Sequence, residues 1–216
     1  MNQTKTEKAT ILCMFSGGID STGVLHQLLT NEKFEEHPII LHHIHIHNRE
    51  NRARAELQAV KEILAYYKTN VQKEFVVTES VFNTMGFAGL KAKRFPYDMD
   101  VCAFYGANLA VAKKEIRHVA WGRTKTDVNS GGNFEVRMKR MQDVFNSVWV
   151  LEKEQPPSFI FPIIDYDKKQ IWFSLPEPVR KMVWWCRTPV YEGNIARPCG
   201  SCGTCLQVKE LINGKE

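Results

Sequence analysis

A run of small and polar residues near the start of the chain has the composition of a phosphate-binding loop. Residues 16–21 read Ser-Gly-Gly-Ile-Asp-Ser and are called the glycine loop below. They follow a short apolar run at 11–15 and precede a segment with apolar residues at helical spacing. This pattern predicts a buried strand, a glycine turn and a helix N-terminus. Glycines let backbone N–H groups approach an anion, and the helix start adds unpaired N–H donors and a positive dipole end.

The glycine loop differs from the common P-loop. That motif has four residues between its glycines and a lysine after the second, whereas Gly17 and Gly18 are adjacent and no lysine follows. Further candidate hydrogen-bond donors to a phosphate are the hydroxyls of Ser16, Ser21 and Thr22. Asp20 beside phosphates suits Mg²⁺, which prefers a carboxylate together with phosphate oxygens. An ordinary turn with Asp20 or Ser21 as the helix cap is the competing interpretation.

Four cysteines near the C-terminus have the spacing of a metal site. Cys186, Cys199, Cys202 and Cys205 follow the pattern Cys-x12-Cys-x2-Cys-x2-Cys and are called the cysteine cluster below. Four thiolates complete a tetrahedral zinc shell, and a Cys-x2-Cys turn places two sulfurs on one ion. A disulfide pair and an iron–sulfur cluster are the alternatives. Structural zinc is the favoured interpretation, because four protein ligands leave no open position for catalysis.

The elements that position these residues alternate regularly along the chain. Apolar runs predict five strands, at 11–15, 38–47, 73–78, 117–121 and 159–164. Helical spacing predicts helices at 20–29, 49–67, 98–114, 133–150 and 165–175. The order predicts an α/β fold, a five-stranded parallel sheet with helices on both faces. We expect a domain at 1–175 and a small zinc-binding module at 176–216, with an irregular lid at 79–96.

Two motifs carry a resemblance to known enzymes. The glycine loop after a buried strand resembles the SGGxDS pyrophosphate-binding loop of the N-type ATP pyrophosphatases, the PP-loop enzymes. Trp-Trp-Cys at 184–186 and Pro-Cys-Gly-Ser-Cys-Gly-Thr-Cys at 198–205 resemble the C-terminal zinc motif of the QueC family, the 7-cyano-7-deazaguanine synthases. Shorter matches lie between them in the same order: Asn48-Arg49 with Glu56, Gly122 with Asp127, and residues 162–168.

The resemblance implies an adenine-nucleotide α-hydrolase-like fold and an ATP-dependent reaction. The family converts 7-carboxy-7-deazaguanine to the nitrile with ammonia and two ATP, by way of an acyl-adenylate and an amide. It further implies a homodimer, a small-molecule deazapurine substrate and structural zinc. The pyrophosphate and magnesium contacts carry over to Ser16, Gly17, Gly18, Asp20 and Ser21. Thr22, next to the loop, and Gly122, at a strand end, are further candidates for nucleotide binding. Catalytic roles in charge stabilisation and substrate contact fall to Asp20, Arg123, Asp127 and Lys168.

Residues at strand ends complete the expected site. Ligands of open α/β sheets bind at the carboxyl ends of strands, where Gly122 and Arg123 follow the strand at 117–121. Gly122 would let the nucleotide approach the backbone, and Arg123 would neutralise the departing pyrophosphate. The strand at 38–47 carries alternate histidines, for which a half-exposed surface is favoured over a metal site. Asn48 and Arg49, which follow it, are expected to face the site.

Two segments depart from the family pattern near the expected substrate site. Residues 129–137 replace the family's Tyr-Pro-Asp-Cys-Arg, and residues 47–49 read His-Asn-Arg where the family has Gly-Gln-Arg. The alternatives are therefore an enzyme that stops at the amide, one that adenylates another carboxylate, or a tRNA-modifying PP-loop enzyme. The last would need a catalytic cysteine pair, but Cys13 and Cys102 lack CxxC partners and are expected to be buried apolar residues.

Composition bounds the remaining function classes. The chain has 216 residues, 44% of them hydrophobic and 25% charged, which fits one soluble domain with a small appendage. No long apolar run predicts a membrane span, and the first residues lack a secretory signal, so we expect a cytoplasmic protein. The net charge is +5, and residues 89–140 hold eleven Lys and Arg against five Asp and Glu. ATP alone accounts for this charge, so direct nucleic-acid binding is not expected. A non-catalytic zinc-ribbon protein would leave the glycine loop unexplained.

Overall fold

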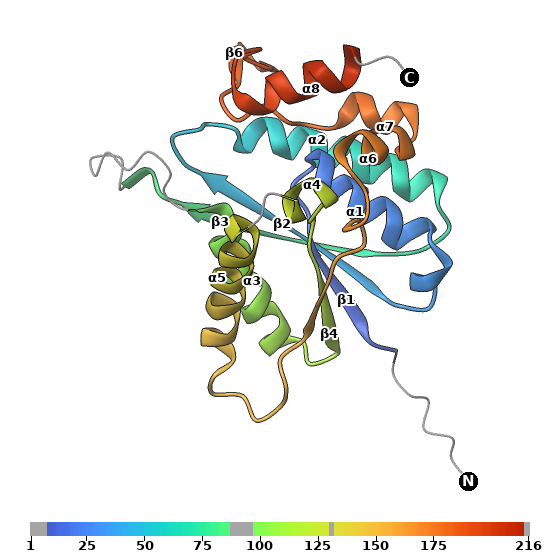
Figure 1. Cartoon of the computed structure of the whole chain (residues 1–216), viewed down its shortest axis with the longest axis vertical. Coiled ribbons are helices and arrows are strands. Elements are labelled where there is room, and N and C mark those ends of the chain that lie inside the picture. Colours follow the sequence, from blue (N-terminus) through green and yellow to red (C-terminus); the bar gives the residue numbers. More distant parts are fainter. Residues whose placement is uncertain (1–7, 87–96, 130–131, 214–216) are drawn as a thin grey trace.

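The computed structural model describes residues 8–86, 97–129 and 132–213. Its centre is a sheet of five parallel strands, as the sequence predicts (Figure 1). The strands are arranged in the order β3-β2-β1-β4-β5. The strands are β1 (Thr10–Met14), β2 (Ile39–His47), β3 (Val76–Asn83), β4 (Ile116–Ala120) and β5 (Ser158–Ile160).

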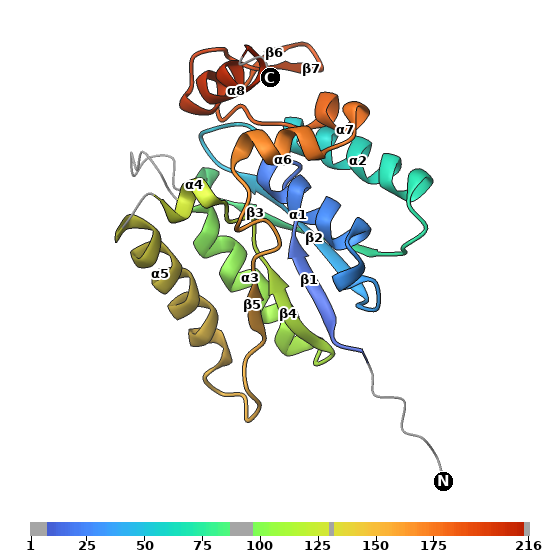
Figure 2. The same cartoon turned by 45° about the vertical axis from the view of Figure 1, so that its right-hand side comes forward.

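Helices cover both faces of the sheet (Figure 2). One face carries α1 (Ile19–Thr30), α2 (Ala53–Asn70), α6 (Lys168–Ser174) and α7 (Glu177–Met182), and the 3-10 helix η1 (Glu32–Phe34) follows α1. The other face carries α3 (Asp98–Ala112) and α5 (Gly132–Trp149). The single-turn α4 (Lys125–Val128) lies between β4 and α5 in the chain.

The alternation of side chains along β1 explains this double cover. Ile11 and Cys13 pack in a core cluster with α1 and α2, whereas Leu12 packs with residues of α3 and α5 such as Phe145. All four side chains are almost completely buried. Full burial of one large apolar side chain contributes about 1.5–3 kcal/mol, so a central strand is stabilised by a continuous apolar run.

The strand order places the glycine loop at a topological switch point. The chain moves from β1 outward to β2 and β3, and then returns to the other side of β1 with β4 and β5. The carboxyl ends of β1 and β4 are therefore adjacent, and they lead into the glycine loop and Gly122. Crevices at such switch points are where open α/β sheets bind ligands.

Two strand predictions were wrong at their ends. Strand β3 continues to Asn83, where irregular structure was predicted, because every residue from Val76 pairs with the long strand β2. Strand β5 ends at Ile160, before Pro162, which has no N–H to donate to a neighbouring strand. Residues 87–96 of the predicted lid lie outside the described residues.

Of the alternate histidines of β2, His43 is more buried than predicted, whereas His45 is half-buried and His47 is exposed. His43 is 1% exposed rather than half-exposed, and one of its ring nitrogens, Nδ1, lies 2.9 Å from the carbonyl oxygen of Phe15. His42 is 3% exposed and its two ring nitrogens contact the hydroxyls of Thr78 and Ser80. The reason is that β2 is flanked by strands on both sides and covered on both faces.

The C-terminal residues add a hairpin and a helix beyond the carboxyl ends of the sheet strands (Figures 1 and 2). Strands β6 (Val190–Glu192) and β7 (Ile195–Arg197) are antiparallel, and α8 (Gly203–Asn213) follows them. The sequence predicted a metal module here but not these elements. Within the described ranges, no helix is both long enough and apolar enough to cross a bilayer.

Candidate active site

The glycine loop has a backbone that only glycine suits at one position. Gly17 has φ +71°, and a Cβ placed on it would lie 3.2 Å from the backbone nitrogen of Val60. Gly18 is the N-cap of α1 and offers no side-chain cap, so the first turn is not capped by Asp20 or Ser21 as the competing interpretation required. The N–H groups of this turn remain suited to an anion.

Two serines close the glycine loop on itself. The hydroxyl of Ser21 accepts a hydrogen bond from the backbone N–H of Ser16 at 3.3 Å and donates one to the carbonyl of Gly18 at 3.2 Å. The two hydroxyl oxygens lie 3.1 Å apart. Thr22, which was also predicted as a nucleotide contact, differs from the two serines. It is fully buried and lines neither of the cavities described below.

Asp20 is the acidic group at the centre of the site. Its Oδ2 lies 3.3 Å from Nζ of Lys168, and its buried Oδ1 has no hydrogen-bond partner among the described residues. Burial raises the pKa of Asp20, and the charges of Lys168 and Arg123 partly oppose that rise. A Cβ on Gly122 would lie 3.2 Å from the Cβ of Asp20, so glycine is what lets the end of β4 approach α1 this closely.

Arg123 brings a second cation to the same place. Its side chain is buried, and neither Nε nor Nη2 has a hydrogen-bond partner in the described part of the chain. Such a group is costly to bury unless an anion completes its hydrogen bonds. Asp127 also lies near Asp20, whose pKa its charge raises. Its Oδ2 accepts hydrogen bonds at 3.0 Å from both the N–H and the hydroxyl of Thr124, which caps α4.

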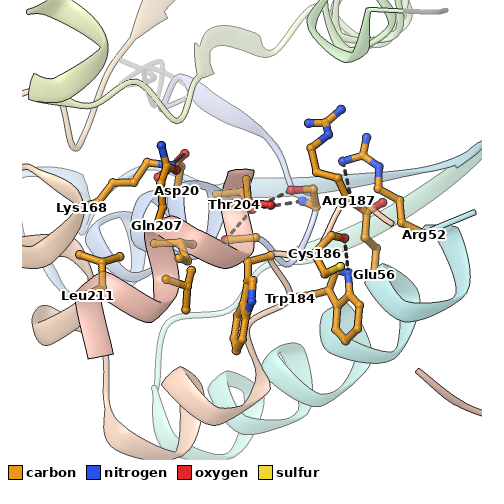
Figure 3. A pocket seen from close by; sticks show the side chains of 16 residues that line it. Asp20, Arg52, Glu56, Lys168, Trp184, Cys186, Arg187, Thr204, Gln207 and Leu211 are labelled. Atoms are coloured by element: carbon orange, nitrogen blue, oxygen red, sulfur yellow. Dashed lines mark hydrogen bonds and ion pairs between the residues drawn. The ribbon is translucent and has the colours of Figure 1, made fainter. Parts of the chain in front are cut away.

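Two cavities meet at the glycine loop. The smaller one, about 170 Å³, lies between the loop and the C-terminal residues, among them Trp184 and Gln207 (Figure 3). The larger one, about 270 Å³, extends toward β2 and α3 and is lined by apolar residues such as Ile44 and Trp121. The residues common to both cavities are Ser16, Asp20, Ser21, Arg52, Glu56 and Arg187.

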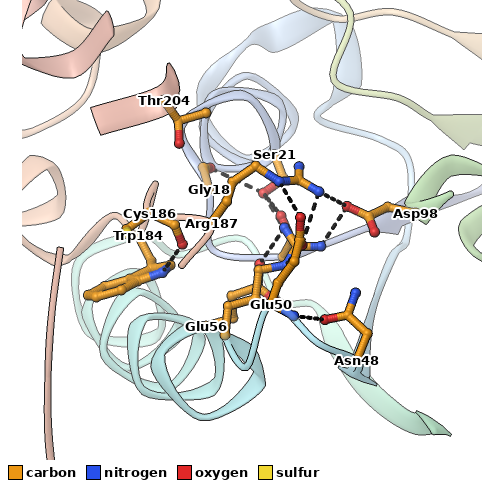
Figure 4. A network of polar contacts seen from close by, with 12 residues as sticks. Gly18, Ser21, Asn48, Glu50, Glu56, Asp98, Trp184, Cys186, Arg187 and Thr204 are labelled. Atoms are coloured by element: carbon orange, nitrogen blue, oxygen red, sulfur yellow. Dashed lines mark hydrogen bonds and ion pairs between the residues drawn. The ribbon is translucent and has the colours of Figure 1, made fainter. Parts of the chain in front are cut away.

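A network of ion pairs joins the two cavities (Figure 4). Arg52 contacts Glu50 at 3.0 Å, Glu56 at 3.2 Å and Asp98 at 2.5 Å. Arg187 holds Glu50 through two hydrogen bonds, at 2.9 and 3.0 Å, and reaches Asp98 at 3.3 Å. Burial raises the pKa of Glu56 to about 7, and the charges of Asp98 and Glu50 add to the rise. The charges of Arg52 and Arg187 oppose it.

Most residues of this network were absent from the sequence prediction. The sequence instead pointed to Asn48 and Arg49, which precede α2. The Oδ1 of Asn48 accepts a hydrogen bond from the backbone N–H of Glu50 at 3.0 Å and shapes the turn before α2. Arg49 is exposed and lines neither cavity, whereas Arg52 lines both. No local pattern marks Arg52, Asp98 or Arg187, because their contacts join segments far apart in the chain.

The cysteine cluster is arranged for a single metal ion. All four sulfurs lie within 4.8 Å of one another, and the Cys199–Cys205 and Cys202–Cys186 pairs are both 4.0 Å apart. A tetrahedral zinc–thiolate site with Zn–S bonds of about 2.3 Å requires sulfurs about 3.8 Å apart. The sulfurs around a [4Fe–4S] cluster lie farther apart, because each binds a different iron atom.

Comparisons with known proteins agree with this site. The model of the family described as "Queuosine biosynthesis protein QueC" matches residues 10–213. Among solved structures, the U34-tRNA thiolase NcsA from Methanococcus maripaludis with its [4Fe-4S] cluster is similar, with a TM-score of 0.52 and 14% identity. That similarity covers 99% of this chain and 68% of the thiolase, and at this identity it shows the fold alone. A search of curated proteins finds no match. The chain belongs to the QueC family.

Proposed function

We propose that this protein is an ATP-dependent synthase that converts 7-carboxy-7-deazaguanine to 7-cyano-7-deazaguanine with ammonia, releasing AMP and pyrophosphate. Membership of the family supports an ATP-dependent PP-loop enzyme of queuosine-like biosynthesis. The observation that carries the finer proposal is the grouping of two cations around Asp20, which lines both cavities: Lys168 lines the smaller cavity, and Arg123 is buried close enough to lower the pKa of Asp20, although it lines neither cavity. One cavity can hold the nucleotide while the other holds the acceptor.

The site residues suit pyrophosphate departure. The N–H groups of the glycine loop and α1 would bind the β- and γ-phosphates, and Arg123 and Lys168 would neutralise the charge that develops on the leaving group. Mg²⁺ would be held by Asp20, whose Oδ1 has no partner among the described residues, together with phosphate oxygens. It would add positive charge at the same oxygens. The protein then needs only to align the acceptor carboxylate with the α-phosphorus.

Two rounds of adenylation complete the reaction. The acceptor carboxylate attacks the α-phosphorus and releases pyrophosphate, and ammonia then displaces AMP to give the amide. In the second round the amide oxygen attacks a second ATP, and loss of AMP with that oxygen leaves the nitrile. The attack of ammonia and the dehydration of the amide both release protons. Glu56 lines both cavities and can accept these protons, because burial raises its pKa to about 7.

The cysteine cluster fits a zinc ion with a structural role. Its four sulfurs have the separation of a mononuclear tetrahedral site, and four ligands leave no position for substrate. A tRNA thiolase, the alternative, would need a reactive cysteine outside the cluster. Burial raises the pKa of both Cys13 and Cys102 to about 12, which disfavours their thiolate forms. Cys13 is fully buried, whereas Cys102 is half-buried and lines the larger cavity.

Mass spectrometry of a reaction with ATP, Mg²⁺, ammonium and 7-carboxy-7-deazaguanine tests the proposal. Nitrile and AMP are expected. Formation of the amide alone would mean that the reaction stops after one round. The absence of both amide and nitrile would contradict the proposed acceptor. Asp20→Asn should lose AMP formation while keeping its fold, because the variant loses the carboxylate that holds Mg²⁺. The matched control is Asp165→Asn, an exposed carboxylate that lines neither cavity.

A further inference from the structure

Four consecutive residues join the cysteine cluster to the nucleotide site. The backbone N–H of Trp184 donates a hydrogen bond of 2.9 Å to the carbonyl oxygen of Gly17. Two residues later, Cys186 contributes its sulfur to the cysteine cluster. The next residue, Arg187, forms the ion pairs with Glu50 and Asp98 (Figure 4). Residues 184–187, called the linking segment below, thus contact the glycine loop, a metal ligand set and the wall of both cavities within four positions.

The glycine loop needs restraint from outside itself. Adjacent glycines have more accessible backbone conformations than any other residue pair, and a single set of them aims the N–H groups at phosphate. The hydroxyl of Ser21 holds the residues on either side of Gly17, because it accepts from the N–H of Ser16 and donates to the carbonyl of Gly18. The carbonyl of Gly17, between them, is instead fixed by the N–H of Trp184. Movement of the linking segment would therefore release the part of the loop with positive φ.

The cysteine cluster in turn holds the linking segment. Cys186 lies 4.0 Å from Cys202, which precedes α8, while Thr204 and Gln207 of α8 line the smaller cavity with Trp184. A metal ion bonded to all four sulfurs would tie the linking segment to α8. Without the metal ion, thiols or mutually repelling thiolates would face one another. No bond through the sulfurs would then hold the linking segment against α8.

We propose that Trp184 and Arg187 are positioning residues that couple metal occupancy of the cysteine cluster to nucleotide binding at the glycine loop. The inference rests on the proposed ATP-dependent function and gives the metal a role beyond stabilising its own module. Because coupling between two binding sites is reciprocal, zinc must strengthen nucleotide binding by the same factor by which nucleotide strengthens zinc binding.

The test measures both halves of this linkage on the full chain. Calorimetry gives the Kd of α,β-methylene-ATP, which cannot be cleaved between its α- and β-phosphates, for zinc-loaded and zinc-stripped protein. Competition with a chromophoric chelator gives the zinc affinity with and without the nucleotide. We expect removal of zinc to weaken nucleotide binding about tenfold, and nucleotide to raise zinc affinity by about the same factor. Circular dichroism should show that the stripped protein keeps its helices and sheet.

A pair of variants isolates the hydrogen bond to Gly17. Trp184→Pro removes the N–H, whereas Trp184→Ala removes the same indole but keeps the N–H. Val183, with φ −60° and ψ 133°, already has a conformation that a following proline accepts. The proline variant should bind zinc without coupling, and the alanine variant should remain coupled. Arg187→Gln should weaken the coupling as well, while Arg197→Gln, an exposed arginine of the same module paired with Glu192, should not.

Four results would count against the inference. Equal nucleotide Kd with and without zinc would contradict it and leave the proposed function intact. Absence of nucleotide binding by zinc-loaded wild type would contradict the proposed function and the inference together. Equal coupling in Trp184→Pro and Trp184→Ala would exclude the Gly17 contact, and if the proline variant does not fold, unchanged coupling in Arg187→Gln decides against the linking segment.

Discussion

Replacing each of the two adjacent glycines by alanine should have very different effects on stability. Gly17 has φ +71°, a left-handed backbone that costs an alanine about 1–2 kcal/mol. Its Cβ would also lie 3.2 Å from both the backbone nitrogen and the Cγ2 of Val60, and 3.3 Å from the Cβ of Ala59. Crowding of this kind costs about 1–3 kcal/mol, because α2 must shift to relieve it. The free energy of unfolding of Gly17→Ala should therefore fall by about 2–5 kcal/mol.

Gly18→Ala is the matched control, one residue away in the same loop. Gly18 has φ −80° and ψ 165°, which any residue adopts, and its added Cβ would make contacts of 3.4 and 3.5 Å. Alanine is a poorer N-cap than glycine by roughly 1 kcal/mol, and the reduced entropy of the unfolded chain offsets about half of this. The free energy of unfolding should thus change by less than about 1 kcal/mol.

Urea unfolding of the zinc-loaded proteins, followed by circular dichroism, measures both changes. The m-value should be the same in the three proteins, so that the midpoints report stability directly. In a thermal melt, Gly17→Ala should lower Tm by about 4–20 °C. Equal midpoints for the two alanine variants would refute the reasoning, because they would show that the left-handed conformation and the contact with Val60 carry no energetic weight.

Two further predictions concern a buried histidine and a lysine of the site. Burial lowers the pKa of His42 to about 4, so the neutral ring favours the folded state above pH 6.5 and this preference is lost as pH falls toward 4. Between pH 6.5 and 4, the free energy of unfolding of wild type should fall by about 3 kcal/mol more than that of His42→Asn, as urea melts at several pH values would show. A difference in unfolding free energy between the two proteins that does not change with pH would contradict the burial argument. Glu56 titrates in both proteins and cancels from the difference. Lys168→Met should lower kcat/KM for AMP formation about a hundredfold, because a cation at the leaving pyrophosphate is lost. Lys169→Met, an exposed neighbour, should leave it unchanged, and equal losses in both would exclude a specific role for Lys168.

The sequence predicts the parts of the fold that depend on local patterns. Strand β1 is buried on both faces, so it is a continuous apolar run, and the glycine loop directly after it marks the start of α1. The cysteine cluster was equally readable, because three of its four residues lie within seven positions. Residues that follow separate strands, such as Asp20 after β1 and Gly122 after β4, could be brought together because the parallel topology fixes where the carboxyl ends of these strands meet.

The predictions failed where pairing between distant segments decides the structure. Strand β3 is an edge strand with Glu79 and Ser80 in its middle, and only its pairing with β2 extends it to Asn83. The ion pairs of Arg187 reach back 137 residues to Glu50 and 89 residues to Asp98, and no spacing in the sequence records such contacts. The same holds for the hydrogen bond between Trp184 and Gly17, which sequence patterns did not indicate.

The central claim is that the glycine loop binds ATP for cleavage between its α- and β-phosphates. Reactions with ATP labelled at the α-phosphate, and separately at the γ-phosphate, resolve which bond is broken when the products are separated. The α-label should appear in AMP and the γ-label in pyrophosphate, with both signals dependent on ammonium and the deazapurine carboxylate. Label in ADP and inorganic phosphate instead would contradict the claim, because it would place cleavage at the γ-phosphate.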